Sequence, residues 1–272
     1  MTTDTLDVSF PTLPTTIEEV EELIATGETN PDRLIEIVKQ CPSTSVNVLR
    51  RANSAYYGLR HEVESVEQAV RLLGFIEVTS IVILEGANEM RDQLTNHTGL
   101  LDRIMHASIF TGRFTQQSVR QLDLADDWVR LSFSVGLIHV MGRLVLLYSD
   151  PDQYGPLADG QNASLPAAAD ERRLFGESHR TLALLASEHW DLSDRICSVL
   201  RGAIALSDLP EGRRRTLAVT TRAGSALAQR DLEGDSFELP DDLPMAETGL
   251  SEELVVVAAE DAKKYSANLG VF

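Results

Sequence analysis

The chain has 272 residues, of which 43% are hydrophobic, so it can bury the core of one large domain or two small ones. Its 42 acidic residues outnumber its 24 basic residues, and the formal net charge is −18. This balance argues against binding to nucleic acid, because phosphate contacts need a basic face and residues 213–215 are the one basic cluster. The low lysine content of this acidic chain is typical of proteins from salt-loving organisms, so we call the composition halophile-like.

The cysteine content and the first residues predict the compartment. Cys41 and Cys197 are too few for a disulfide framework, and neither belongs to a C-x-x-C pair. The chain does not begin with a basic segment followed by an apolar one, as a secretory signal would. We therefore expect a cytoplasmic protein with reduced thiols.

The first part of the chain reads as a series of short helices. Residues 1–14 are polar and contain two prolines, which predicts a flexible arm. Apolar residues then recur at helical spacing, with capping residues at the predicted starts and glycines at several ends. An N-terminal helical half is predicted over residues 15–95, with helices near 16–27, 31–41, 46–57, 65–74 and 76–90.

The second half, residues 99–230, follows the same helical pattern, and no strand alternation is visible. Helices are predicted near 100–119, 126–149, 167–190, 193–206 and 213–229, and the pattern at 167–190 allows a break near Gly176. A surface loop is predicted at 150–166, which is rich in proline, glycine and aspartate. An acidic linker at 231–250 precedes a C-terminal helix at 251–272, which has acidic residues in its first turn. The predicted fold class is all-α.

Residues 131–148 (LSFSVGLIHVMGRLVLLY) are the most apolar run and contain one histidine, His139. Gly136 and Gly142 lie three residues to either side of His139, on the same face of a helix, and would let another helix approach closely. The run is too polar, and its unbroken apolar part too short, to span a membrane. It is predicted to be a buried core helix, and no membrane association is expected.

Three patches together resemble the HDOD family, bacterial signalling domains related to the HD metal-dependent phosphohydrolases. They are residues 49–59 (LRRANSAYYGL), residues 63–74 (VESVEQAVRLLG) and residues 136–144 (GLIHVMGRL), the last being close to a family pattern GLLHDIGKL. A weaker fourth patch consists of Glu171, Gly176, His179 and Trp190. The resemblance implies an HDOD domain over residues 15–230, with an N-terminal helical bundle packed on an HD-like helical core.

The resemblance also implies structural roles for the motif residues Asn53, Ser54, Gly58, Gly74 and Trp190. Asn53 and Ser54 are expected to bond main-chain carbonyls between the two halves, since asparagine and serine side chains readily bond to nearby backbone.

The related enzymes hold divalent metals with histidines and aspartates, and the metal activates a water for attack on a phosphoester. Carried over by motif, His106, His139 and His179 match histidine ligands, but Val140 stands where the aspartate of the HD pair is expected. No carboxylate occurs around Ala223, where a last aspartate is expected. Magnesium and manganese prefer carboxylate oxygens, although three histidines alone suffice for zinc.

We therefore predict a degenerate HD site without catalytic residues and without a bound cofactor. Its residues are His106, His139, Val140, Arg143 and His179. The alternative is a divalent metal held by the three histidines. A simpler interpretation makes His139 a core histidine bonded to a backbone carbonyl and His179 a surface residue.

The favoured function is a non-catalytic signal-transduction module, a pseudoenzyme that acts through contacts with a protein partner or with a second copy of itself. The first alternative is a metal-dependent phosphohydrolase acting on a nucleotide or cyclic dinucleotide. The second is a sensor that binds a nucleotide in the emptied site, where Arg143 offers a planar fork for a phosphate.

Overall fold

The computed structural model describes residues 19–20, 22–23, 26, 30–54, 57–89, 94–158, 164–190 and 192–268. All regular structure in these ranges is helical, which confirms the all-α prediction. The predicted arm at 1–14 and most of the helix predicted at 16–27 lie outside the described residues. The chain divides into two compact units, one between residues 12 and 93 and the other from residue 94 onward.

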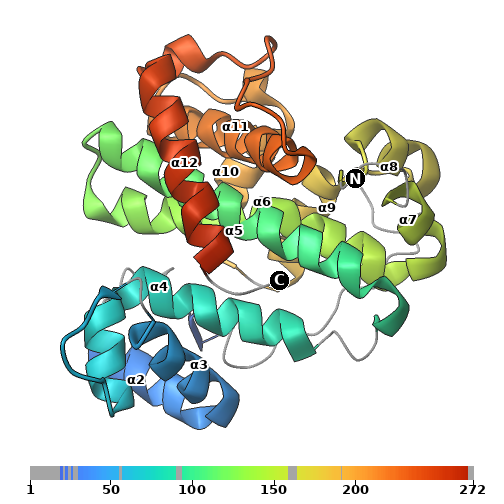
Figure 1. Cartoon of the computed structure of the whole chain (residues 1–272). Coiled ribbons are helices and arrows are strands. Elements are labelled where there is room, and N and C mark those ends of the chain that lie inside the picture. The colour runs from blue at the N-terminus through green and yellow to red at the C-terminus, as the bar shows by residue number, and fades with distance from the viewer. Residues whose placement is uncertain are drawn as a thin grey trace. The chain divides into compact units, whose positions relative to one another are not determined.

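The first unit contains α2 (Pro31–Gln40), α3 (Pro42–Ala52) and α4 (Val66–Glu89), with α2 and α3 both packed on α4 (Figure 1). The Asn30 side chain caps α2 by accepting a hydrogen bond from the Asp32 backbone N–H at 3.0 Å. Gly74 has the non-helical φ of 78°, so α4 consists of two helical segments that meet at a kink, in agreement with the helices predicted at 65–74 and 76–90.

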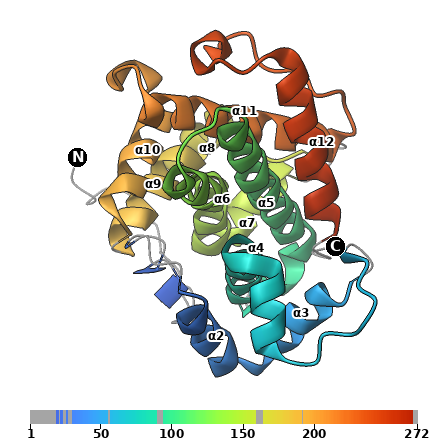
Figure 2. The ribbon, with the colours of Figure 1, turned by 90° about the vertical axis from the view of Figure 1, so that its left-hand side faces the viewer.

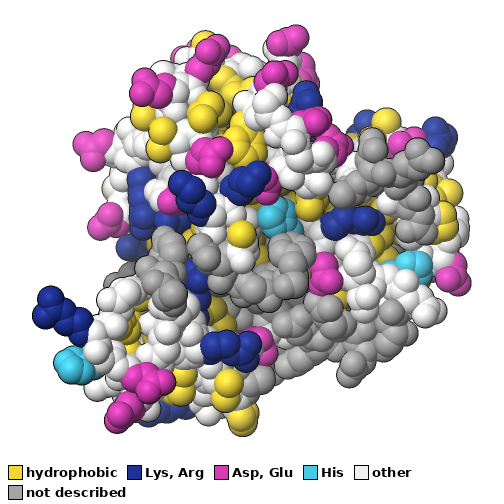
Figure 3. Space-filling view, in the orientation of Figure 1, with side chains coloured by type: hydrophobic (Ala, Val, Ile, Leu, Met, Phe, Trp, Pro, Cys, Tyr) yellow, Lys and Arg dark blue, Asp and Glu magenta, His cyan; other side chains and the backbone are white. Residues whose placement is uncertain are grey.

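In the second unit, α5 (Thr98–Gln121) and α6 (Asp126–Ser149) lie side by side at the centre (Figure 2). α9 (His179–His189) packs on α6, while α11 (Arg213–Glu233) and α12 (Glu252–Asn268) pack on α5. α10 (Asp194–Ile204) joins α9 to α11. Acidic side chains are spread over the face formed by α11, α12 and the segment between them (Figure 3).

α6 is the core helix that the sequence predicts, since nearly all its side chains from Val129 to Leu147 are buried. The expectation that this run is too short and too polar for a membrane span is wrong. By length and composition α6 is apolar enough to cross one, but 94% of its most apolar stretch is buried inside the structure. A helix that other helices cover on every side needs no lipid to bury its apolar surface.

Gly136 and Gly142 admit two different neighbouring helices. A methyl group on Gly136 would lie 2.7 Å from the Thr111 carbonyl oxygen of α5. A methyl group on Gly142 would overlap the His179 carbonyl oxygen and lie 2.7 Å from the Ala183 backbone nitrogen of α9. The prediction of close helix approach beside His139 is confirmed, with α5 against one glycine and α9 against the other.

Two connections differ from their predictions. The stretch predicted as a loop at 150–166 contains α7 (Pro151–Ala158), because Asp150 accepts a hydrogen bond from the Gln153 backbone N–H and Tyr154 is fully buried. α8 (Ala168–Phe175) follows and ends at Gly176, whose φ is 80°. α11 continues to Glu233, so the first residues of the predicted linker at 231–250 are helical. The described residues of this unit also contain three short 3₁₀ segments: η3 (Thr95–His97), η4 (Leu206–Asp208) and η5 (Met245–Thr248).

The C-terminal helix α12 is anchored to α5 by charge and by burial. Arg113 on α5 donates through Nε to Asp261 Oδ2 at 2.5 Å, and its guanidinium carbon lies 4.7 Å from the centre of the Tyr265 ring. Ala258 and Ala262 of α12 are fully buried. α12 therefore belongs to the hydrophobic core of this unit.

Candidate functional site

Two of the three predicted site histidines form a buried pair. His139 lies in the middle of α6 with 1% of its surface exposed, and His179 begins α9 with 2% exposed. Their rings meet edge to face, with centroids 5.9 Å apart. The absence of a side chain at Gly142 lets the start of α9 lie directly against α6, and this close approach brings the two rings together.

Glu171 on α8 holds the pair from the side of His179. One carboxylate oxygen, Oε2, accepts hydrogen bonds from His179 Nδ1 at 2.5 Å and from the His179 backbone N–H at 2.9 Å. The other, Oε1, accepts from the Tyr154 hydroxyl at 3.0 Å and lies 3.3 Å from Arg143 Nε. Arg143 also donates to the Pro166 carbonyl at 3.1 Å. Glu171 thus fixes the His179 ring with its hydrogen on Nδ1, which leaves Nε2 as the acceptor.

Burial and neighbouring charges determine which of these groups are ionised. Burial raises the pKa of Glu171, but His179 and Arg143 outweigh it and bring this pKa to about 2. Burial and then Arg143 lower the pKa of His179 to about 4, although Glu171 opposes them. Burial, His179 and Arg180 hold the pKa of His139 well below its ordinary value. Near neutral pH the carboxylate is ionised and both imidazoles are neutral.

The third histidine, His106, lies in a different group. Its Nε2 is 2.9 Å from Asp231 Oδ2 on α11, and Asp231 Oδ1 is 2.8 Å from Lys263 Nζ on α12. These contacts connect α5, α11 and α12. Within the ranges that the structure describes, no three histidine, cysteine, aspartate or glutamate side chains gather as metal ligands.

The residues around His139 and His179 do not fit a divalent metal. Val140 is fully buried where the resemblance places an aspartate. The turn where it places the last carboxylate carries Arg222, and the charge of Arg222 contributes to the lowered pKa of His139. The buried carboxylate of Glu171 already binds His179 and Arg143. A dication would meet positive charge here without the anionic ligands that it prefers.

The simpler interpretation is right that His139 is a buried core histidine, but it is wrong about its hydrogen bond and about the exposure of His179. In the part of the chain that is described, neither ring nitrogen of His139 has a hydrogen-bond partner, so the ring is not bonded to a backbone carbonyl. His179 is buried and not a surface residue. Arg143, predicted as a fork for phosphate, is occupied by Glu171 and by the Pro166 carbonyl.

Four further residues complete the site and were not predicted as part of it: Tyr154, Glu171, Arg180 and Arg222. Glu171 occurs in the fourth resemblance patch, so its fixed spacing to His179 was a usable signal. Arg180 follows His179 directly, and a charged residue at the start of an otherwise apolar helix face is a weaker signal. Arg222 lies far along the chain, so only the packing of α11 reveals it.

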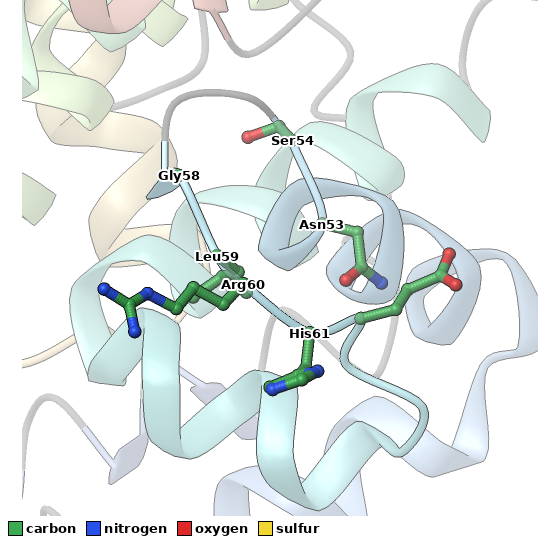
Figure 4. A pocket seen from close by; sticks show the side chains of 7 residues that line it. Asn53, Ser54, Gly58, Leu59, Arg60 and His61 are labelled. Atoms are coloured by element: carbon green, nitrogen blue, oxygen red, sulfur yellow. The ribbon is translucent and has the colours of Figure 1, made fainter.

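The motif residues of the first unit shape a separate loop. The Asn53 side chain accepts a hydrogen bond from the Val63 backbone N–H at 2.7 Å and donates to the Val63 carbonyl at 2.8 Å. Asn53 therefore bonds backbone as expected, but within its own unit, which corrects the prediction of a tie between halves. A pocket of about 250 Å³ lies beside it, lined by Asn53, Ser54 and residues 58–62 (Figure 4). Figure 4 shows the Arg60 side chain pointing away from Asn53, and Gly58 turns the chain with φ 55°.

Comparison with known proteins identifies this architecture. The sequence profile of the HDOD domain matches residues 10–203. The chain belongs to the HDOD family. A curated relative of this HDOD chain, an uncharacterized protein of Treponema pallidum (strain Nichols), is 18% identical over 239 residues. The match covers 85% of the HDOD chain but 44% of the relative, so the chain spans less than half the length of that protein.

Solved structures share the fold at low sequence identity. An HDOD domain protein of unknown function from Geobacter sulfurreducens has a TM-score of 0.71 at 18% identity and covers 97% of this chain and 94% of its own. A proposed signal transduction protein of Marinobacter aquaeolei VT8 has a TM-score of 0.73 at 21% identity, and the match covers 98% of this chain and 59% of that protein. A proposed metal-dependent phosphohydrolase of Shewanella amazonensis SB2B has a TM-score of 0.61 at 17% identity, and the match covers 95% of this chain and 93% of that protein.

Proposed function

We propose that this HDOD chain is a regulatory module that relays a signal through contacts with a partner protein or a second copy of itself, without phosphohydrolase chemistry. One observation carries the proposal: the charges of Arg180, Arg143 and Arg222 act on His139, where a metal-dependent hydrolase needs anions. Val140 and Arg222 replace the expected carboxylates, and His106 is bound to Asp231. The similarity to a proposed signal transduction protein supports a role in signalling.

A combined metal and activity measurement tests the absence of chemistry. We expect elemental analysis of protein purified without chelator to find well below one equivalent of iron, manganese or zinc. We also expect no hydrolysis of bis-p-nitrophenyl phosphate or of cyclic dinucleotides above the buffer rate with added manganese. Stoichiometric metal that disappears in His139→Ala, or metal-dependent turnover, would instead support the phosphohydrolase alternative.

Cross-linking in the source cells tests the protein contacts. The chain should be recovered in a defined complex with one partner protein, or with a second copy of itself, in fixed stoichiometry. A surface variant such as Arg201→Ala, with 61% of its side chain exposed, serves as the control for correct folding. Recovery of the chain as an isolated monomer under all cross-linking conditions would contradict the proposal.

A further inference from the structure

Arg180 on α9 is a partly buried arginine. Among the residues that the structure describes, its buried Nε atom has no hydrogen-bond partner and its side chain forms no ion pair. The chain carries a net charge of −18, so acidic partners are abundant elsewhere in it. A buried charge that lacks an opposite charge costs folding free energy, which suggests a purpose other than stability.

Other positively charged side chains lie around Arg180. Burial, followed by the guanidinium groups of Arg222 and Arg143, lowers the pKa of Arg180 to about 10. Glu171 opposes this effect, but it is already bound to Arg143 and His179. In the described part of the chain, the buried Nε atom of Arg222 also has no hydrogen-bond partner, and Arg222 pairs with the exposed Asp242 at 3.5 Å. Positive charge therefore exceeds negative charge here.

His139 adds unused hydrogen-bonding groups next to the arginines. The charges of Arg180 and Arg222 act on its ring, and both ring nitrogens lack partners among the residues described. A neutral imidazole offers one N–H donor and one acceptor. Arg180 and Arg222 remain partly exposed while His139 is 1% exposed, so a ligand coming from solvent meets the arginines first.

We propose that Arg180, Arg222 and His139 form a binding site for a phosphate group, either as free phosphate or as part of a small phosphorylated ligand. Two incompletely neutralised guanidinium groups match a phosphomonoester, which carries a charge of about −1.5 to −2 near neutral pH, better than a singly charged carboxylate. Each guanidinium can also bind two oxygens of one phosphate. This inference rests on the proposed function in that the site binds its ligand and does not hydrolyse it.

Titration of the full chain at constant ionic strength tests the site. Inorganic phosphate, AMP and acetate are added separately to protein in phosphate-free buffer, and binding is followed by calorimetry and by the thermal midpoint. We expect saturable binding of phosphate or AMP and none of acetate. Arg180→Gln should weaken binding at least tenfold. Arg173→Gln, which removes a guanidinium with 75% of its side chain exposed, should bind like the unaltered chain.

A second measurement separates a binding role for Arg180 from a structural one. Ligand-free Arg180→Gln should melt no lower than the unaltered chain, because an uncompensated charge has been removed. Phosphate should also shift the ring-nitrogen NMR signals of His139. If AMP binds more tightly than inorganic phosphate, the ligand is a nucleotide or similar ester; if not, it is the free ion.

Three results would overturn the inference: no saturable binding of phosphate or AMP, equal binding of acetate, or unchanged affinity in Arg180→Gln. Release of inorganic phosphate from AMP is followed in the same samples. Such release would contradict the proposed function and not the binding site, so the two failures are distinguishable.

Discussion

The α-carbon of Gly142 lies directly against the backbone of His179, so close that a single added methyl group would overlap the His179 carbonyl oxygen. This contact places the start of α9 on α6, and the centroids of the His179 and His139 rings lie 5.9 Å apart. The backbone packing of two helices therefore determines the geometry of the buried pair.

Gly142→Ala should reduce the free energy of unfolding by about 3 kcal/mol, because rigid backbone on α9 has no room to yield. Urea denaturation measures the change. The matched control is Gly99→Ala on α5, where an added methyl group meets nothing within 4 Å. The control should be as stable as the unaltered chain or more stable by up to about 1 kcal/mol. Equal effects of the two substitutions would contradict the close contact.

Glu171→Gln should destabilise the fold by about 4 kcal/mol, since it leaves the buried guanidinium of Arg143 without its anionic partner. Asp170→Asn on the same helix is the control, because Asp170 is 41% exposed and pairs with exposed Arg173. The control should change stability by less than about 0.5 kcal/mol. A loss below about 1 kcal/mol in Glu171→Gln would show that the carboxylate does not hold the site together.

The stability of the chain should depend on pH through its buried histidines. The pKa of His179 is about 4 in the fold against an ordinary 6.5, so between these values the unfolded chain binds a proton that the folded chain does not. The associated stability is complete above pH 6.5 and is lost as the pH falls toward 4. The pKa of His139 is lowered in the same direction, by burial first.

Replacing His139 isolates its share of this pH dependence. Urea denaturation from pH 7 to pH 4 in phosphate-free buffer should show a slope shallower by up to about 1.4 kcal/mol per pH unit in His139→Gln. The control His61→Gln, at an exposed position, should keep the slope of the unaltered chain. An unchanged slope in His139→Gln would mean that the ring takes up its proton at the same pH in the folded and the unfolded chain.

Arg113→Ala should loosen α12, because it removes the ion pair with Asp261 and the contact over the Tyr265 ring. Hydrogen exchange of the α12 amides should accelerate at least tenfold, while α6 remains protected. Arg195→Ala is the matched control: Arg195 also pairs with an acidic residue, Asp127, and stacks on Trp128, but on a more exposed surface. Equal protection of α12 in both variants would mean that buried apolar contacts alone hold it.

Helix positions were predictable because their signals are local. The side chains of Asn30 and Ser193 accept hydrogen bonds from the first turns of α2 and α10, and both helices begin where these capping residues predict. The break predicted at Gly74 is confirmed by its non-helical backbone between the two segments of α4. Helix α7 was missed because its stability comes from the burial of Tyr154 against distant residues, and its own sequence is rich in loop-forming residues.

The sequence by itself determined the helical class, the family resemblance, the close approaches at Gly136 and Gly142, and the replacement of an expected aspartate by Val140. Tertiary structure alone decided which side chains surround His139. In the folded chain His106 pairs with Asp231, whereas the charges of Arg180 and Arg222 act on His139. The reason is physical: helix formation depends on residues within a few positions, whereas the charge at a buried site is the sum over helices that packing brings together from distant parts of the chain.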